Sequence, residues 1–167
     1  MAFLLARNRV VVEENDEQLK KIISNQLISN FFLQICKDFN IMTPKKPREV
    51  YKEMIAEKQD NVSSAQLNLA DAFVNGLVNL GTSKDSLFSN AQDPFITKVK
   101  TKGILTAVGT LGLIHMWNFE EFSSVISDYF DLKDGFAKAG ACIALGLTTT
   151  GIQDENDPAL ALLEDSI

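Results

Sequence analysis

The chain has 167 residues, enough for one domain or for one section of a larger repeat array, and 46% of them are hydrophobic. Its formal net charge of −6 would repel a nucleic-acid backbone, and no apolar run approaches the roughly 20 residues of a membrane helix. We therefore expect neither nucleic acid nor membrane among its partners, and a location in the cytoplasm and nucleus.

Residue types that carry catalysis or bind metals are scarce. Cys36 and Cys142 are far apart and each is surrounded by apolar residues, so both are expected in the core rather than in a zinc or redox site. His115 is the only histidine, and no second ligand stands at metal-binding spacing from it. The sequence predicts no metal, no cofactor and no catalytic activity.

The first third of the chain has helical spacing of its apolar residues. After a short extended arm at residues 9–12, a candidate strand, apolar residues recur at three and four positions between 19 and 39, which predicts two short helices or one bent helix. The segment TPKKP at 43–47 breaks this pattern, and Pro47 suits the first turn of another helix. The apolar face of that helix would contain Val50, Tyr51, Met54 and Ile55.

The next segment, LNLADAFVNGLVNLG at 67–81, predicts an amphipathic helix. Ser63 and Gln66 in front of it form a capping-box pattern, and Gly81 is placed to end it. The expected polar stripe consists of Asn68, Asp71, Asn75 and Asn79. The opposite face, predicted to pack in the core, consists of Leu67, Ala70, Phe73, Val74, Leu77 and Val78.

Two later segments, KGILTAVGTLGLIHMW at 102–117 and AKAGACIALGLTTTG at 137–151, share the pattern G-x-x-x-A-[V/L]-G. A period of this length with helical content is typical of stacked helix pairs. We therefore divide the chain into a helical segment at 1–96 and two repeats at 97–167, the second incomplete. The equivalent positions are Gly103, Ala107 and Gly109 in the first repeat and Gly140, Ala144 and Gly146 in the second.

Glycine inside a helix costs about 1 kcal/mol relative to alanine, so these positions need a compensating reason. A membrane span and a phosphate loop find little support, which favours close packing of helix backbones. Gly103, Gly109, Gly140 and Gly146 are the predicted repeat-packing residues. In particular, we expect Gly109 and Gly146 to occupy equivalent places, each in contact with another helix backbone.

An amphipathic helix is predicted at 119–130, between the two glycine-containing helices, and another begins after Asp157, a natural N-cap followed by Pro158. The fold class is therefore all-α, built from stacked helix pairs. The exposed face of the helix at 119–130 would contain Glu120, Glu121, Ser124 and Asp128.

The glycine-containing helices resemble the proteasome/cyclosome repeat. Together with NIMTPKKPREVYK (40–52), LNLADAFVNGLVNLG (67–81) and DPALALLED (157–165), they make nearly the whole chain similar to the proteasome/cyclosome-repeat scaffold subunits of the proteasome regulatory particle. The family's members are several times longer, so the resemblance implies a piece of an α–α superhelix or toroid. Ser166 departs from the family, which usually has an aromatic residue there.

The resemblance also implies a function without catalysis. Family members contact the ATPase ring of the proteasome base and dock ubiquitin, the ubiquitin-like domains of shuttle factors, and a deubiquitinase, using outer helices of the repeats. By matching, Glu120, Glu121, Ser124 and Asp128 are the candidate protein-binding residues. The isolated chain is expected either to self-associate through its open repeat end or to cover that end with its last helix.

One alternative belongs to a different class: a small helical enzyme centred on His115, with Glu120 or Glu121 as the nearby carboxylate. It requires a concave pocket that holds His115 and a carboxylate, with a perturbed pKa. A histidine on the surface, or packed against Trp117, would exclude it.

Overall fold

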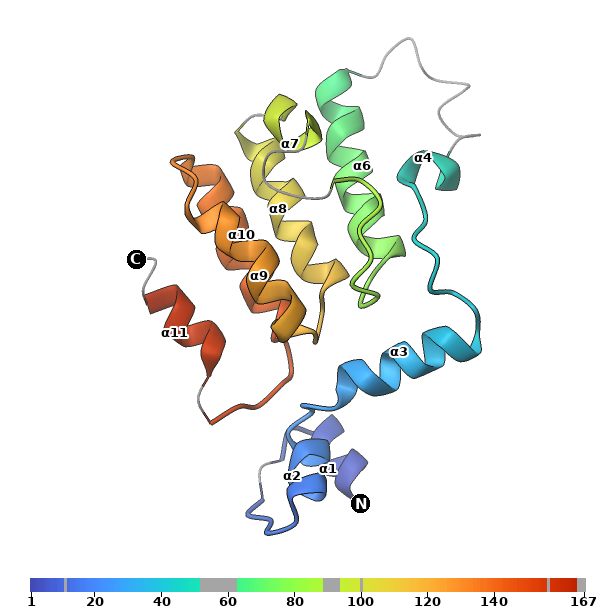
Figure 1. Ribbon diagram of the computed structural model, residues 1–167, viewed down its shortest axis with the longest axis vertical. Helices are drawn as coiled ribbons and strands as arrows, with labels where there is room; N and C mark the ends of the chain where they lie inside the picture. Colours follow the sequence, from blue (N-terminus) through green and yellow to red (C-terminus); the bar gives the residue numbers. More distant parts are fainter. Residues whose placement is uncertain (11, 52–62, 89–93, 100, 156, 165–167) are drawn as a thin grey trace.

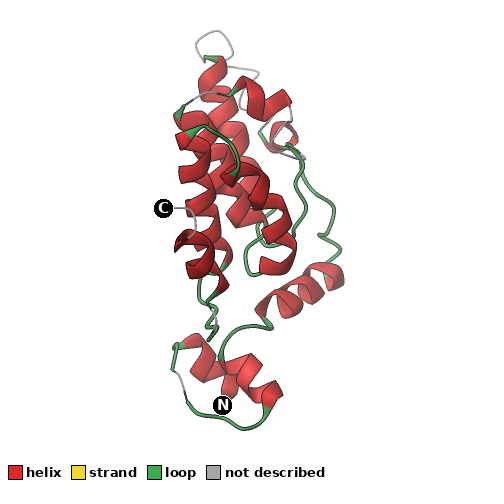
Figure 2. Ribbon diagram, turned by 60° about the vertical axis from the view of Figure 1, so that its left-hand side comes forward, coloured by secondary structure: helices red, strands yellow, loops and turns green. Residues whose placement is uncertain are grey.

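The computed structural model describes residues 1–10, 12–51, 63–88, 94–99, 101–155 and 157–164. Within these ranges every regular element is a helix, so the predicted all-α fold is confirmed (Figure 2). Of the candidate strand at 9–12, residue 11 lies outside the described residues, and residues 9, 10 and 12 form no strand. No described helix is both long enough and apolar enough to cross a lipid bilayer. The helices are α1 (Ala2–Arg7), α2 (Glu17–Ile23), α3 (Ile28–Asp38), α4 (Pro47–Val50), α6 (Ser64–Val78), α7 (Pro94–Lys98), α8 (Lys102–Ile114), α9 (Phe119–Phe130), α10 (Gly135–Thr148) and α11 (Pro158–Glu164).

Helix starts follow the predicted signals. The capping box of α6 is complete, because the backbone N–H of Gln66 donates to Ser63 Oγ at 3.3 Å and the backbone N–H of Ser63 donates to Gln66 Oε1 at 3.0 Å. The carboxylate of Asp157 accepts a hydrogen bond from the N–H of Leu160 at 3.1 Å, with Pro158 at the first position of α11. The apolar spacing of residues 19–39 forms two helices, α2 and α3, rather than one bent helix.

The centre of the molecule is a stack in which α8 lies between α6 and α10 (Figure 1). Helix α9 packs against α10, and α11 lies beside α10 near the C-terminal end. The most deeply buried apolar side chains come from α8, α9 and α10, which together form the main core. They include Val108, Leu111, Ile114, Phe122, Ile126, Tyr129, Ala141 and Leu145.

Glycine allows the backbones of this stack to approach closely. A Cβ atom added at Gly140 would lie 2.6 Å from the carbonyl oxygen of Leu105, and one added at Gly112 would collide with the backbone of Ala144. On the other side of α8, a Cβ at Gly76 in α6 would lie 2.9 Å from Thr110 Cβ. Side chains at these positions would push the helices apart, which explains glycine in helices where its propensity is poor.

The four glycines predicted to pack the repeats do not behave alike. Gly109 faces α10, since its added Cβ would lie 3.8 Å from the carbonyl oxygen of Gly140. Gly146, predicted to make the equivalent contact, is exposed and has nothing within 4 Å, so this prediction is wrong within the described residues. The described part of the chain therefore brings no neighbouring helix into contact with Gly146. Gly103 approaches Val99, in the segment between α7 and α8, rather than another repeat.

The predicted orientation of α6 is also wrong. The polar side chains of Asp71 and Asn75 are 2% and 0% exposed, whereas Phe73 and Leu77, assigned to the core face, are 48% and 61% exposed. The polar stripe is buried because neighbouring segments provide hydrogen-bond partners for it. Asn79 accepts a hydrogen bond from the backbone N–H of Lys45 at 2.8 Å and donates one to its carbonyl oxygen at 3.0 Å.

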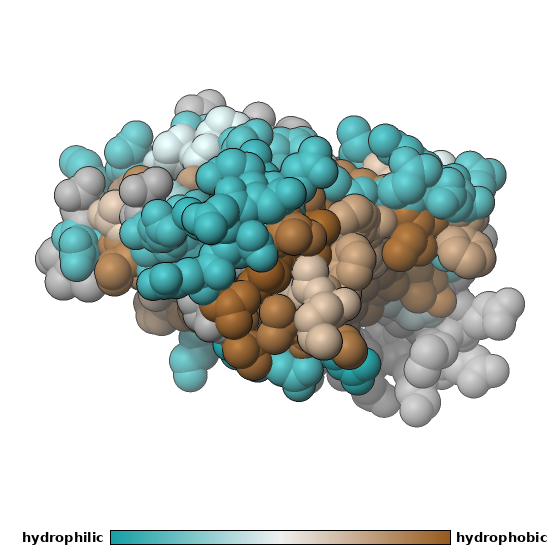
Figure 3. Space-filling model, turned by 90° about the horizontal axis from the view of Figure 1, so that it is seen from below, coloured by the Kyte–Doolittle hydropathy of each residue, from teal (hydrophilic) through white to brown (hydrophobic). Residues whose placement is uncertain are grey.

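The N-terminal helices α1, α2 and α3 lie at one end of the molecule (Figure 1). They are joined to the segment between α10 and α11, where the side chain of Asn25 donates to the carbonyl oxygen of Gly151 at 3.0 Å and the N–H of Gln153 donates to that of Ser24 at 2.8 Å. Seen from this end, the surface shows apolar areas beside polar ones (Figure 3). Exposed apolar side chains of α1 and α3 are Phe3, Leu4, Phe31 and Ile35.

Candidate functional site

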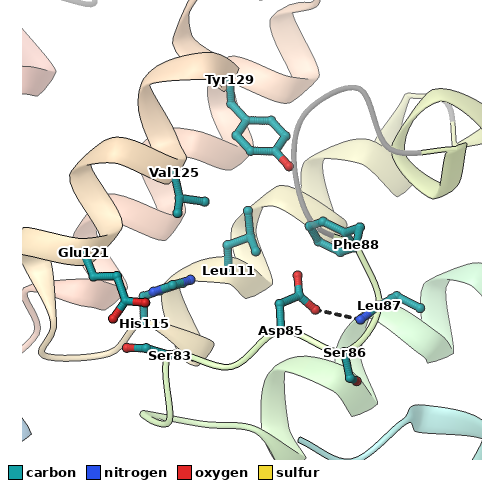
Figure 4. Close-up of a pocket in the computed structure, with 10 residues that line it drawn as sticks. All are labelled: Ser83, Asp85, Ser86, Leu87, Phe88, Leu111, His115, Glu121, Val125 and Tyr129. Carbon is teal, nitrogen blue, oxygen red and sulfur yellow. Dashed lines mark hydrogen bonds between the residues drawn. The ribbon is translucent and has the colours of Figure 1, made fainter.

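A pocket of about 410 Å³ lies where the segment after α6 passes the C-terminal end of α8 and the face of α9 (Figure 4). Its walls come from three sources: the segment 83–88, the end of α8, and α9. The lining residues are Ser83, Asp85, Ser86, Leu87, Phe88, Leu111, His115, Glu121, Val125 and Tyr129.

Backbone hydrogen bonds fix the segment 81–83 against α8. The N–H groups of Gly81 and Ser83 donate to the carbonyl oxygens of Leu113 and Ile114, both at 2.9 Å. These carbonyls belong to the last turn of α8 and have no partner within that helix. The segment therefore closes the end of α8 and starts the pocket wall at a defined place.

Asp85 is positioned by its neighbours and by α6. Its Oδ1 accepts hydrogen bonds from the side chain of Asn75 at 2.7 Å and from the backbone N–H of Leu87 at 2.8 Å. Its other oxygen, Oδ2, is buried, and no hydrogen bond to it is found among the described residues. Burial raises the pKa of Asp85, although the hydrogen bonds from Leu87 and Asn75 oppose the change. The pocket lining thus includes a carboxyl group that hydrogen bonds from Asn75 and from its own loop hold in place.

His115 follows α8 directly and is 5% exposed. Its ring packs against that of Phe122 with 5.6 Å between centroids. Its Nδ1 atom is buried and has no hydrogen-bond partner in the part of the chain that the structure describes. Burial lowers the pKa of His115, while the charge of Glu121 acts in the opposite direction. At neutral pH the imidazole is therefore uncharged.

The structure brings only part of the predicted site together. Glu120, Glu121, Ser124 and Asp128 are all exposed on α9, as the helical pattern predicts. Glu121 alone among them lines the pocket, and its carboxylate accepts a hydrogen bond from the side chain of Asn118 at 2.8 Å. His115 meets the first requirement of the enzyme hypothesis, because a pocket holds it together with a carboxylate. The ring contact of His115 is with Phe122, so the packing against Trp117 that would exclude the hypothesis is not what the described residues show.

The arrangement nevertheless offers little for catalysis. Nucleophilic catalysis needs a hydroxyl or thiol hydrogen-bonded to a base, which a third group orients. Nδ1 of His115 has no such partner, and Oγ of Ser83 accepts a hydrogen bond from Asn118 at 2.9 Å instead. Within the described ranges no group of three or more His, Cys, Asp or Glu side chains could hold a metal ion.

Sequence analysis missed the contribution of Asp85 and its neighbours, which it treated as part of a loop. A signal was present in the polar stripe of α6. A helix that buries Asn75 and Asn79 needs polar groups opposite them, and the segment with Asp85 and Ser86 is the nearest polar sequence. Asp85 also bonds the N–H two residues ahead, a local contact that aspartate favours in turns.

Comparison with known proteins identifies relatives for nearly the whole chain. The family model for the RPN1 N-terminal domain matches residues 1–56. The chain is 32% identical to the 26S proteasome regulatory subunit rpn-1 of Neurospora crassa, with 99% of the chain covered, and 33% identical to rpn1 of Schizosaccharomyces pombe, with 95% covered. It is also 32% identical to the 26S proteasome non-ATPase regulatory subunit 2 of Dictyostelium discoideum, over its whole length.

The aligned region is a small part of these relatives, covering 20%, 19% and 19% of their respective lengths. The family-model match ends inside the segment 1–96, so the division at residues 96 and 97 stays a prediction. The sequence identity extends along nearly the whole chain, and the all-helical structure is consistent with it. The chain is thus a relative of the 26S proteasome regulatory subunits RPN1 and non-ATPase subunit 2, and it spans about a fifth of their length.

Proposed function

We propose that the chain is a non-catalytic scaffold section of the proteasome regulatory particle base that supports ubiquitin-dependent protein degradation. The observation that carries this proposal is the identity of about a third over nearly the whole chain to 26S proteasome regulatory subunits of several organisms. In a scaffold, the functional parts are the packed helices and their exposed surfaces.

The stack has the features of a section of a longer array. Gly109 faces the next inner helix of the stack, and Gly146, its equivalent by sequence, lies on the open side of α10. Ile143 on the same helix is also exposed. Repeat arrays bury such faces against the next repeat. The open side of α10 therefore suits a further helix pair.

For partners, we propose the ATPase subunits of the proteasome base, ubiquitin, the ubiquitin-like domains of shuttle factors, and a deubiquitinase. The exposed face of α9 supports a docking role, because Glu120, Glu121, Ser124 and Asp128 stand on the outer side of a helix whose other side is anchored in the core. We place this function in the cytoplasm and nucleus.

The pocket around His115 favours a second candidate, a small helical enzyme with Glu121 as the neighbouring carboxylate. The uncharged imidazole could accept a proton. It lacks the hydrogen-bonded nucleophile and the orienting group that such a mechanism requires, so the scaffold role has the stronger support.

Affinity capture from cell extract tests the scaffold role. The tagged chain and a full-length relative are used side by side, and base ATPase subunits are quantified by mass spectrometry. Gly140→Leu, which would force α10 away from α8, should reduce capture, whereas Gly146→Leu at an open position should leave the fold intact. Capture by neither protein, or capture unchanged by Gly140→Leu with a demonstrably disrupted stack, would contradict the proposal.

A further inference from the structure

The helices α6, α8 and α10 end in the same way. The third residue after each helix has a positive φ, and we call these three the turn residues: Gly81 (69°), Trp117 (67°) and Gly151 (79°). In all three turns the N–H of the next residue donates to the carbonyl oxygen of the residue that directly follows the helix, at 3.2, 2.9 and 3.0 Å respectively. A positive φ is rare for a side chain as bulky as that of tryptophan, which indicates that the packing of the stack requires this turn.

The turn residue of one helix is hydrogen-bonded to the last turn of the next helix. The N–H of Gly81 after α6 donates to the carbonyl oxygen of Leu113 in α8 at 2.9 Å. The N–H of Trp117 after α8 donates to the carbonyl oxygen of Thr148 in α10 at 2.7 Å. Carbonyls in the last turn of a helix have no partner within that helix, so each bond satisfies an acceptor that the helix leaves open. The same backbone bond therefore joins both pairs of neighbouring helices.

A glycine five residues before the turn residue makes a second contact with the next helix. This glycine is Gly76 in α6 and Gly112 in α8. A Cβ atom added at Gly76 would lie 2.9 Å from Cβ of Thr110, and one added at Gly112 would collide with the backbone of Ala144. Thr110 and Ala144 are themselves equivalent, because each lies seven residues before the turn residue of its own helix. Both pairs of helices are thus joined at the same two points.

Helix α10 carries the same two groups. Gly146 lies five residues before Gly151, it is exposed, and a Cβ atom added there would meet no described atom within 4 Å. The N–H of Gly151 makes no backbone hydrogen bond within the described ranges, while its carbonyl oxygen accepts one from the side chain of Asn25 at 3.0 Å, which holds the turn in place. In this register Gly146 is equivalent to Gly112, whereas the sequence pattern paired it with Gly109.

We propose that Gly146 and the N–H of Gly151 form a third docking site of this kind, and that its occupant is the C-terminal half of one further α-helix of the array. That helix carries a small residue opposite Gly146, and a carbonyl of its last turn accepts the hydrogen bond from Gly151. The array then begins at α6 instead of at residue 97. The inference rests on the proposed scaffold role for the assignment to an array, and it adds the chemistry of the helix that continues the stack.

A further helix suits the site better than a second copy of the chain does. In a second copy, the small residues Thr110 of α8 and Ala144 of α10 are already in contact with the preceding helix of the stack. Helix α6 has the larger Val74 seven residues before its turn residue, and it already packs against α8 and α4. Continuity with the two formed interfaces therefore favours a helix that presents a small residue, with that residue still free.

The first test measures the exchange of backbone amide hydrogens by NMR in the unmodified chain. The amides of Gly81 and Trp117 are hydrogen-bonded and should exchange at least about a hundredfold more slowly than that of Gly151. Sedimentation at the same concentrations gives the oligomeric state. Protection of Gly151 equal to that of Trp117 in the monomer would overturn the proposal. Protection that rises with chain concentration would overturn it too, because a second copy would then be the occupant.

The second test supplies the occupant. A second copy of residues 118–151, inserted directly after Gly151, adds one further unit of α9 and α10 with its own Ala144 at the contact position. The Gly151 amide of the original unit should then exchange as slowly as that of Trp117, and the extended chain should unfold at a higher denaturant concentration, since an added repeat contributes a new interface. Gly146→Leu in the original unit should remove that gain, although it leaves the unextended chain stable.

Matched variants of the inserted unit assign the effect to the contact. Ala144→Leu in the inserted copy fills the position opposite Gly146 and should restore fast exchange of Gly151. Ala139→Leu in the inserted copy makes the same change at an exposed position and should leave Gly151 protected. The proposal fails if the insertion changes neither the exchange of Gly151 nor the unfolding midpoint, whether or not the inserted unit folds, or if Gly146→Leu acts equally in both chains. These measurements involve no proteasome subunit, so their outcome is separate from that of the capture experiment.

Discussion

The two contacts that organise this molecule bury helix faces by different physical means. Between α8 and α10, small residues let the backbones approach until there is no room for a Cβ at Gly112 or Gly140. Between α6 and the segments around it, the buried face is polar, and Asn75 and Asn79 are held by hydrogen bonds. The first contact depends on shape and tolerates no added volume, while the second depends on paired donors and acceptors and tolerates no missing partner.

Added volume should break the first contact with the largest effect. Gly140→Leu should lower the free energy of unfolding by about 3 kcal/mol or more, because its Cβ would already lie 2.6 Å from the carbonyl oxygen of Leu105. Denaturant unfolding measures the change. Gly146→Leu is the matched control in the same helix and should be neutral or stabilise by up to about 1 kcal/mol through better helix propensity. Equal losses of unfolding free energy in both variants would show that the space for a side chain does not differ between the two positions.

Removing a partner should break the second contact with a smaller effect. Asn75→Ala should cost about 2 kcal/mol, since the Asn75 side chain donates to Asp85 and accepts from Asn79 and Ser86. Asn68→Ala changes the same residue type on the same polar stripe, at a position with no side-chain hydrogen bond within the described ranges, and should cost less than about 0.5 kcal/mol. If the two variants unfold at the same denaturant concentration, the buried network does not stabilise the fold.

Two of the titratable groups that line the pocket, His115 and Asp85, should affect stability in opposite directions as the pH changes. Burial lowers the pKa of His115 from 6.5, so the folded chain binds fewer protons there than the unfolded chain. The contribution of the neutral imidazole is present above pH 6.5 and is lost as the pH falls through the lowered folded pKa. Relative to His115→Gln, the wild-type chain should therefore lose stability on acidification in that range, as measured by denaturant unfolding at several pH values.

Asp85 should show the opposite trend. Burial raises its pKa from 3.8, so the folded chain binds more protons than the unfolded chain above that value. Its contribution is fully present below pH 3.8 and is lost as the pH rises through the raised folded pKa. The wild-type chain should thus gain stability relative to Asp85→Asn as the pH falls. A flat difference across this range would contradict the assignment of Asp85 as a buried carboxylate.

Sequence reasoning succeeded where the local pattern determined the structure. The capping box at Ser63, the N-cap at Asp157 and the paired glycine helices depend on nearby residues, and the structure contains all three. The same holds for the exposed face of α9, whose outward residues follow from helical periodicity.

Sequence reasoning failed where the orientation of a helix face depends on which distant segment packs against it. A polar stripe normally faces water, but that of α6 faces other polar groups, which the periodicity of one helix cannot reveal. Gly146 follows the repeat pattern, yet no described residue comes within contact distance of its position. The pocket was missed for the same reason, since Asp85 and His115 are brought together by contacts between distant segments.

The hydrogen bonds that join Asn25 to Gly151 and Ser24 to Gln153 also have a consequence for the order of folding. They connect residues more than 120 positions apart, whereas α8, α9 and α10 are consecutive in the chain. Contacts between distant residues require a large loop to close and generally form late. We therefore expect the N-terminal helices to dock after the stack has formed, although they precede it in the chain. Trp117, the only tryptophan, contacts Phe32 of α3 and donates to the carbonyl oxygen of Thr150, so its fluorescence reports this docking step directly.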